Sequence, residues 1–235
     1  MPRKPPRRTR ARILETALGL FNRFGEPHVT TADIADEMNI SPGNLYYHFR
    51  NKDDIIGELY GALDAGVAPI LAGPSARAAH VEDLWLFLHL LFECMWQYRF
   101  FYRDLDEITS RSPKLAARFA DLTRRSRSAV LELCGGLRAA GALDASDGEL
   151  GALATNVVMI TTYWMSFQRL SRAVAVAAAD AGPGDMRFEH AAAQVLALLA
   201  PYLHGPDRAL VERLGADYRD AAPGGSRGPN LTRRQ

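Results

Sequence analysis

Residues 30–54, TTADIADEMNISPGNLYYHFRNKDD, predict two short helices set at an angle, followed directly by the start of a third. Thr30 is a good N-cap for the first helix, and the carboxylate of Asp33 can accept hydrogen bonds from the exposed amides of its first turn. Asn39 falls where the chain must turn, and asparagine tolerates the left-handed conformation better than any residue except glycine. Ser41 can cap the second helix, so the stretch has the signals of a helix-turn-helix unit.

The second short helix, residues 42–49, has an unusual surface. Pro42 suits its first position, where a missing N–H costs nothing. Leu45 and Phe49 lie four residues apart and can anchor the helix to a core. The side chains left outside form an aromatic and amide surface with almost no charge: Gly43, Asn44, Tyr46, Tyr47 and His48. Such a face on a rigid two-helix unit fits insertion into the major groove of DNA.

The chemistry of this face also suits DNA. Asn44 could read a base edge, and the neighbouring glycine would let the backbone approach closely. Hydrogen bonds to phosphates could come from Tyr46, Tyr47 and His48. Lys52, at the start of the following helix, would add a phosphate contact. The alternative is that YYHF is only the packed end of a small helical domain, but two adjacent tyrosines cannot both point inward.

The same segment resembles the TetR family of bacterial transcriptional regulators. The resemblance is carried by Thr30-Thr31, Ile34-Ala35, Ile40-Ser41-Pro42-Gly43, Leu45-Tyr46-Tyr47-His48-Phe49 and Lys52. Asn39 departs from the glycine of many members, although the turn chemistry survives that change. The resemblance implies an all-helical homodimer with an N-terminal DNA-binding domain and a divergent C-terminal domain that binds a small effector. It also implies that Gly43, Tyr46, Tyr47, His48 and Lys52 match positions that touch DNA.

The N-terminal residues add basic charge. The first eight, MPRKPPRR, are expected to form an arm that either reaches along DNA or is only a disordered solubilising tail. A helix is expected from Thr9, ended by Gly25, with Arg10 and Arg12 at its exposed first turn. The complete set of predicted DNA-binding residues is Arg10, Thr30, Thr31, Ser41, Pro42, Gly43, Asn44, Tyr46, Tyr47, His48 and Lys52.

Composition and charge support this interpretation. The chain of 235 residues is 48% hydrophobic and 23% charged, which is ordinary for a soluble globular protein. Residues 1–52 hold nine Lys/Arg against five Asp/Glu, whereas the remainder holds nineteen against twenty-two. A basic head on a mildly acidic body matches a nucleic-acid-binding end joined to a non-binding one. Cys94 and Cys134 are isolated, and neither a signal core nor a membrane span is evident, so a cytoplasmic protein is expected.

We therefore predict an all-α fold in three parts. Residues 1–54 would form the three-helix DNA-binding domain, residues 55–221 a helical bundle for effector binding and dimerisation, and residues 222–235 a disordered tail. The helix from Val81 to Tyr98 is apolar around most of its circumference, so it must be buried in the bundle. Neither a catalytic motif nor a histidine cluster is present, so no enzyme activity, cofactor or metal site is predicted.

The bundle could hold an aromatic-walled pocket for an amphipathic ligand. The predicted ligand-binding residues are Trp85, His89, Phe92, Trp96, Arg99, Met159, Tyr163 and Ser166. The alternative is that the apolar members simply fill the core. Arg99 and Arg103 could hold a carboxylate or phosphate, or they could pair with Asp104 and Asp106.

A finer similarity concerns the effector. Three stretches are similar to the subgroup of regulators of polyhydroxyalkanoate synthesis: GEPHVTTADIADEMNISPGNLYYHF at 25–49, DLWLFLHLLFE at 83–93 and QYRFFYRDLDEITSRSPKL at 97–115. This similarity implies an effector related to fatty-acid breakdown, such as a fatty acid or an acyl-CoA.

Dimerisation is expected because one helix-turn-helix unit makes too few contacts for useful specificity. Small residues near the C-terminus, Ala191 to Ala193 and Ala197, would let the last two core helices pack closely against a partner, or they could be buried within one subunit. We predict a repressor that binds a palindromic operator and is released by a small amphipathic effector. An activator or a non-responsive DNA-binding protein of the same fold is the alternative, and an enzyme with an accessory DNA-binding head is disfavoured by the missing catalytic motif.

Overall fold

The computed structural model describes residues 6–73, 79–177 and 188–220. Within these ranges the chain forms helices and one isolated bridge between Leu143 and Leu203, so the all-α prediction is confirmed. The chain divides into two compact units, residues 1–67 with 97–119 and residues 68–96 with 120–235. The predicted tail, 222–235, and the start of the predicted arm lie outside the described residues.

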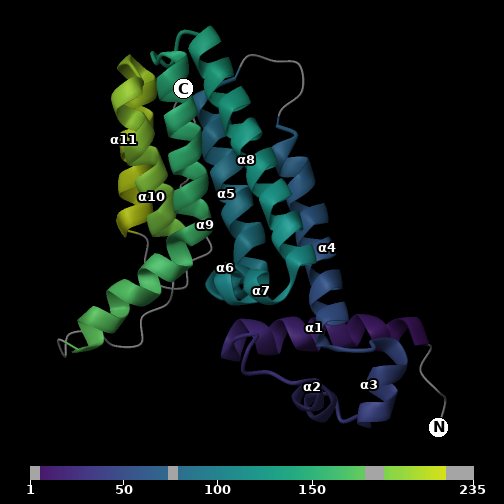
Figure 1. Ribbon diagram of the computed structural model, residues 1–235. Helices are drawn as coiled ribbons and strands as arrows, with labels where there is room; N and C mark the ends of the chain where they lie inside the picture. Colours follow the sequence, from purple (N-terminus) through teal and green to yellow (C-terminus); the bar gives the residue numbers. More distant parts are fainter. Residues whose placement is uncertain (1–5, 74–78, 178–187, 221–235) are drawn as a thin grey trace. The chain divides into compact units, whose positions relative to one another are not determined.

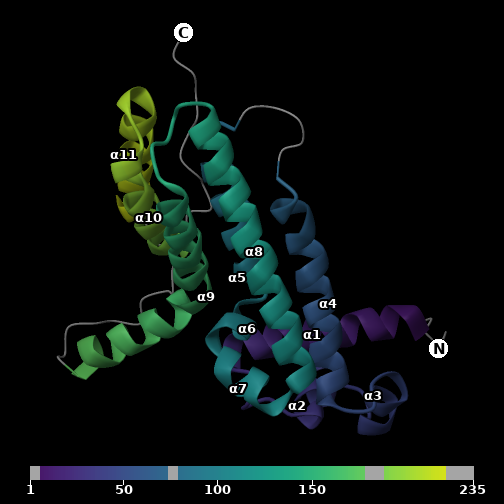
Figure 2. The ribbon, with the colours of Figure 1, turned by 45° about the horizontal axis from the view of Figure 1, so that its top comes forward.

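The first unit contains the predicted helix-turn-helix. Its elements are α1 (Pro6–Phe24), α2 (Thr31–Glu37), α3 (Pro42–His48), most of α4 (Lys52–Leu71), α6 (Arg99–Arg103), α7 (Leu105–Arg111) and the start of α8 (Pro113–Ala139). Helices α2 and α3 lie together along one side of α1 (Figure 1, Figure 2). Helix α1 begins earlier than the expected Thr9, because a proline is well suited to the first turn.

The local signals of the helix-turn-helix are confirmed. The Thr30 hydroxyl accepts from the Asp33 amide at 3.2 Å, and the Asp33 carboxylate accepts from the Thr30 amide at 2.7 Å. Asn39 has φ +52, and the Ser41 hydroxyl accepts from the Asn44 amide at 3.2 Å. Gly25, with φ +97, ends α1 as expected. The starts of α2 and α3 are therefore fixed by hydrogen bonds between residues three apart, and the turn at Asn39 sets the angle between the two helices.

An aromatic core joins α4 to α6 and α8 within the first unit. Tyr60 packs edge-on against Phe119 and Phe101, with ring centroids 4.7 and 5.7 Å apart. Its hydroxyl, although the side chain is buried, donates to the carbonyl oxygen of Arg118 at 2.8 Å. Because the buried hydroxyl is satisfied, the cluster gains apolar burial without an unpaired polar group.

The division into compact units does not coincide with the expected boundary after residue 54. Helices α6 and α7 lie well beyond residue 54 in the chain but pack in the first unit, where the rings of Phe21 and Phe100 lie 5.2 Å apart. The Asn22 side chain accepts from the Phe100 amide at 3.1 Å. The end of α1 is therefore held by a segment almost eighty residues further along the chain.

The second unit is a helical bundle. It contains α5 (Val81–Gln97), the rest of α8, α9 (Asp147–Ala177), α10 (Phe188–Leu199), the 3₁₀ helix η1 (Ala200–Tyr202) and α11 (Gly205–Asp220). Ser146 caps α9, because its hydroxyl accepts from the Glu149 amide at 3.3 Å. Helix α10 packs against α9 and α11, next to which it lies in Figure 1. Ala191, Ala192 and Ala193 are buried in that packing, so these small residues serve contacts within one subunit.

One helix in the described residues is long and apolar enough to cross a membrane by length and composition. It is the stretch of α9 from Asp147 to Ser171. The buried core helix of a bundle passes the same test, and α9 packs against α10 in this bundle.

Candidate nucleic-acid interface and ligand cavity

Helix α3 presents the predicted face to solvent. Tyr47 is 78% exposed and Tyr46 is 51% exposed, whereas Leu45 and Phe49 are buried. The other residues of the face, Ser41, Pro42, Gly43 and Asn44, are exposed and His48 is half-buried. This pattern confirms the predicted orientation of the helix, while contact with DNA stays a prediction.

The tyrosines are held in place by their neighbours. The Tyr46 hydroxyl lies 3.0 Å from the Thr31 hydroxyl, so a hydrogen bond connects α3 to the first residue of α2. The Tyr47 ring meets the His48 ring edge-on, with centroids 5.1 Å apart. Nothing lies within 4 Å of a Cβ built on Gly43, so this position leaves open space beside the backbone. Neighbouring side chains therefore hold Tyr46 and Tyr47, while the position of Gly43 leaves space for another molecule to approach the backbone.

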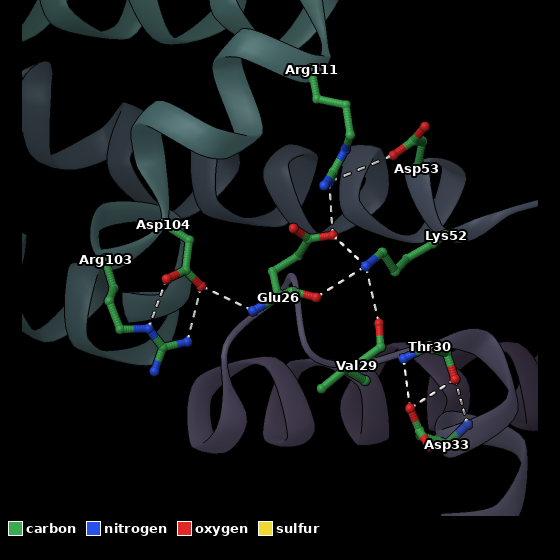
Figure 3. Close-up of polar contacts among 9 residues, drawn as sticks. All are labelled: Glu26, Val29, Thr30, Asp33, Lys52, Asp53, Arg103, Asp104 and Arg111. Carbon is green, nitrogen blue, oxygen red and sulfur yellow. Dashed lines mark hydrogen bonds and ion pairs between the residues drawn. The ribbon is translucent and has the colours of Figure 1, made fainter.

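The ammonium group of Lys52 makes its hydrogen bonds within the protein. Its ammonium donates to the carbonyl oxygens of Glu26 and Val29, both at 3.0 Å. It also lies 2.8 Å from Oε1 of Glu26 (Figure 3). An ammonium has three hydrogens, and these three acceptors use all of them. The structure places Lys52 at the junction of α4 with the loop after α1, and its predicted contact with a phosphate stays a prediction.

Glu26 is the centre of this junction, and the sequence offered no signal for it. Its side chain is fully buried, and Oε1 pairs with both Lys52 and Arg111 at 2.8 Å. Its backbone amide donates to Asp104 at 2.9 Å (Figure 3). A buried carboxylate between two cations is stable only while both remain in place. The loop that leads into the helix-turn-helix is therefore tied to α4 and α7 together.

A second ion pair reinforces the same end of α1. The Arg103 guanidinium pairs with Asp104 at 3.0 Å, which confirms the carboxylate partner considered for this arginine. It also donates to the carbonyl oxygens of Phe21 and Asn22, at 2.6 and 3.1 Å. Cationic groups at a helix C-terminus satisfy its last carbonyls and oppose the negative end of the dipole. The end of α1 is thus capped from α6.

Arg10 is also engaged within the first unit. Its two terminal nitrogens donate to both oxygens of Glu58 on α4, and its guanidinium lies over the Phe49 ring, 4.6 Å from the centroid. A bidentate pair holds an arginine in a fixed orientation. The predicted phosphate contact of Arg10 would require that pair to open.

The predicted ligand-binding residues lie on α5, on α9 and, in the case of Arg99, on α6, and their contact with a ligand stays a prediction. On α5 the rings of Trp85 and His89 stack 5.3 Å apart, and Nε2 of His89 lies 3.5 Å from Glu93. Phe92 is buried and Trp96 is partly exposed. On α9, Met159 and Tyr163 are about half exposed and Ser166 is half-buried. Arg99 belongs to the first compact unit rather than to the bundle.

A cavity of about 550 Å³ lies elsewhere in the second unit. It is lined by the end of α4, one face of α5 and the second half of α8, namely Pro69–Gly73, Ala79, Asp83, Leu86, Phe87, Leu90, Ala129, Glu132, Leu133, Gly136, Ala139 and Ala140. The sequence did not reveal this cavity, because Leu86 and Leu90 fit the pattern of a helix that is apolar all round. Among the described residues, no group of three or more metal-ligating side chains is found.

Comparison with known proteins agrees with the geometry of both units. The family model "Bacterial regulatory proteins, tetR family" matches residues 13–59, and the model "Bacterial transcriptional repressor" of the same family matches residues 64–211. The chain belongs to the TetR family of bacterial transcriptional regulators. It is therefore a regulator and not an enzyme.

Individual relatives show how far the similarity extends. A crystal structure of a TetR-family regulator from Marinobacter aquaeolei VT8 is 34% identical, with a TM-score of 0.78 over 89% of this chain and 98% of that one. The regulator TtgR of Pseudomonas putida is 29% identical over 60% of this chain and 68% of its own length. The probable acrEF/envCD operon repressor of Escherichia coli K12 is 38% identical over 53 residues. These residues cover 23% of this chain and 24% of that repressor, so this chain spans only about a quarter of its length in the match.

Proposed function

We propose that the protein is a cytoplasmic homodimeric repressor that binds a palindromic operator and is released by a small amphipathic effector. The observation that carries this proposal is the exposed face of α3, with Tyr47 78% exposed on a helix whose Leu45 and Phe49 anchors are buried. A large aromatic side chain that stays in solvent has no role in the fold of its own unit. A helix presented in this way fits the major groove.

The contacts with DNA are assigned mainly to α3. Gly43 and Asn44 would approach base edges, while Tyr46, Tyr47 and His48 would contact phosphates and thymine methyl groups. Further contacts are assigned to the starts of α2 and α3, at Thr30, Thr31, Ser41 and Pro42. Lys52 and Arg10 act as positioning residues, because their charged groups are held by Glu26 and Glu58.

The homodimer is assigned to an exposed apolar stripe on α9. Its members are between 48% and 67% exposed and recur every three or four residues: Met159, Tyr163, Phe167 and Leu170. Figure 1 and Figure 2 show the C-terminal part of α9 extending beyond α10 of the same unit. A contiguous apolar face of this kind favours a protein partner, and a second copy would bring two α3 helices to half-sites spaced by roughly 34 Å or its multiples.

Repression is supported by the relative from E. coli, whose name describes an operon repressor. An activator of the same fold is the alternative. The effector is assigned to the bundle, and a fatty acid or acyl-CoA, which the subgroup similarity implies, is one class to be tested. The described cavity has room for a ligand of ordinary small-molecule size.

The proposal is tested by selecting DNA from a random library with the full-length protein and measuring affinity for the enriched sequence by fluorescence anisotropy. We expect a palindrome, and we expect Tyr47→Ala to weaken binding at least about fivefold, since one lost base contact costs about 1–3 kcal/mol. Phe24→Ala, at an aromatic side chain of α1 that is 49% exposed, is the matched control for a lost aromatic ring outside the α3 face and the α9 stripe. Selection of no common sequence, or unchanged affinity of Tyr47→Ala, would refute the proposal.

A further inference from the structure

The first unit carries a groove of about 660 Å³ where the last turns of α1 meet α2. Phe24, at the end of α1, is 49% exposed although the Arg23 guanidinium lies over its ring, 4.8 Å from the centroid. Leu20, one turn earlier, is half-buried, and the buried Val29 also lines the groove. All the residues that line it lie within the described ranges. A partner that covers Leu20 and Phe24 removes apolar surface from water.

The α2 side of the groove is acidic. Asp36 and Glu37, in the last turn of α2, are exposed, and neither side chain has an ion pair among the described residues. Hydrogen bonds from the Thr30 amide and hydroxyl lower the pKa of Asp33, so a third carboxylate stays ionised near neutral pH (Figure 3). Negative charges near a helix C-terminus oppose its dipole, so Asp36 and Glu37 do not stabilise α2. These two carboxylates are therefore available to a cationic partner.

The N-terminal segment of the chain has complementary chemistry. Residues 1–5, MPRKP, precede the described part of α1 and carry Arg3 and Lys4 without an acidic residue. Pro2 and Pro5 each restrict φ to one range, so the segment has less conformational entropy to lose on binding. Segments with two prolines three residues apart commonly bind in grooves with aromatic walls. The segment therefore offers cations to the α2 side of the groove and proline rings to its apolar side.

The segment cannot reach the groove of its own chain. Helix α1 begins at Pro6, and Leu20 and Phe24 lie 14 and 18 residues further along it. At a rise of about 1.5 Å per residue, these two positions are about 21 and 27 Å from Pro6. Five fully extended residues span at most about 18 Å. An occupant with this sequence must therefore come from a second copy.

We propose that residues 1–5 of one copy bind the groove between α1 and α2 of a second copy. The two cations of the segment face Asp36 and Glu37, and its prolines cover Leu20 and Phe24. The inference goes beyond the proposed function, because it gives the DNA-binding unit a protein partner as well as DNA. Exposed ion pairs are weak, so the contact is expected at protein concentrations on the order of 100 µM, well above those of an operator titration.

Zero-length cross-linking of the full-length protein tests the contact directly. A carbodiimide joins a lysine amine to a carboxylate only when the two groups touch, and Lys4 is the lysine of the segment. Isotope-labelled and unlabelled protein are mixed at about 100 µM in low salt, where exposed charges are least screened, and are left to exchange subunits. Mass spectrometry then identifies the linked peptides. We expect links from Lys4 to Asp36 or Glu37 that join a labelled peptide to an unlabelled one.

The cross-links also distinguish other occupants of the groove. Lys114, exposed at the start of α8, is the control and should form no link with Asp36 or Glu37. Links from Lys4 that join only peptides of one isotope would place the segment in its own chain and overturn the proposal. Absence of any link between Lys4 and the two carboxylates, or links from Lys114 in their place, overturns it as well.

Charge reversal supplies an independent check by sedimentation equilibrium. Arg3→Glu with Lys4→Glu, and separately Asp36→Lys with Glu37→Lys, should each weaken association at least about tenfold, because like charges then meet in the contact. A mixture of the two variants should recover the association, because each copy then meets opposite charge. Cations suit the C-terminal end of α2, so the second variant should keep its fold.

A matched variant controls for the change in net charge. Glu15→Lys with Glu132→Lys, at exposed positions outside the groove, changes the charge equally and should associate as the wild type does. None of these variants alters the α9 stripe, so failure of the proposed dimer and failure of this contact are measured separately. Association that is unchanged by both charge reversals, or that does not return on mixing, overturns the proposal.

Discussion

Replacing Lys52 by methionine tests whether this residue holds the helix-turn-helix in place or contacts DNA. The substitution keeps the apolar stem and removes the ammonium. In the wild type this ammonium lies 2.8 Å from Glu26 Oε1 and 3.0 Å from the carbonyl oxygens of Glu26 and Val29. The Glu26 carboxylate then stays buried with Arg111 as its remaining ion-pair partner in the described structure. The variant therefore leaves a buried negative charge with only one cation.

The expected loss of stability follows from this geometry. Removing one partner of a buried ion pair costs about 3–5 kcal/mol when the other charge is left unpaired. Arg111 still lies 2.8 Å from the same oxygen, so we expect a smaller loss, about 2–3 kcal/mol. For a chain of this size that corresponds to a fall in Tm of about 4–12 °C. Urea unfolding followed by circular dichroism measures the free energy, and Lys114→Met, at an exposed lysine of α8, is the control.

Operator binding separates the two roles of Lys52. A positioning residue that makes no phosphate contact should leave the salt dependence of operator affinity unchanged, whereas losing one phosphate contact lowers the slope by about one. Adding Glu26→Gln to the variant should recover part of the lost stability, because the buried charge is removed as well. The reasoning is refuted if Lys52→Met is as stable as Lys114→Met and yet shows a reduced salt slope.

Three further predictions concern pH, the thiols and the dimer. Asp33→Ala should destabilise the protein at pH 7 but much less at low pH. Hydrogen bonds from the Thr30 amide and hydroxyl lower the pKa of Asp33, so the stabilisation by its carboxylate is lost as the pH falls through that lowered pKa. Urea unfolding at both pH values measures the two losses of stability, and equal losses would contradict the prediction. With a thiol reagent at pH 8, Cys94 should react first and Cys134 only on unfolding, because burial raises the pKa of Cys134 to about 11. Peptide mapping identifies the labelled cysteine, and equal labelling of both cysteines in the native protein would contradict this prediction. Tyr163→Asp with Phe167→Asp should yield monomers in sedimentation experiments with the helical circular dichroism retained, whereas a persistent dimer would exclude the α9 stripe as the interface.

The sequence by itself determined the helix-turn-helix and the direction in which it faces. Thr30, Ser41 and Asn39 act on amides within three residues or on their own backbone, so their effects need no distant partner. The outward orientation of Tyr47 followed from the spacing of Leu45 and Phe49 on a single helix face. The family resemblance was readable for the same reason, because its motif is local and continuous.

Only the tertiary structure decided what the charged residues do and where the cavity lies. The charge and sequence position of Lys52 are those expected of a phosphate contact, but in the structure its ammonium binds Glu26, which lies in a loop 26 residues earlier. Glu26 in turn depends on Arg111, 85 residues further along the chain. The cavity requires the end of α4, α5 and α8 to meet, and its two carboxylates are separated by 49 positions in sequence. Hydrogen bonds between neighbours follow from backbone geometry, whereas ion pairs and cavities between distant segments depend on how the helices pack.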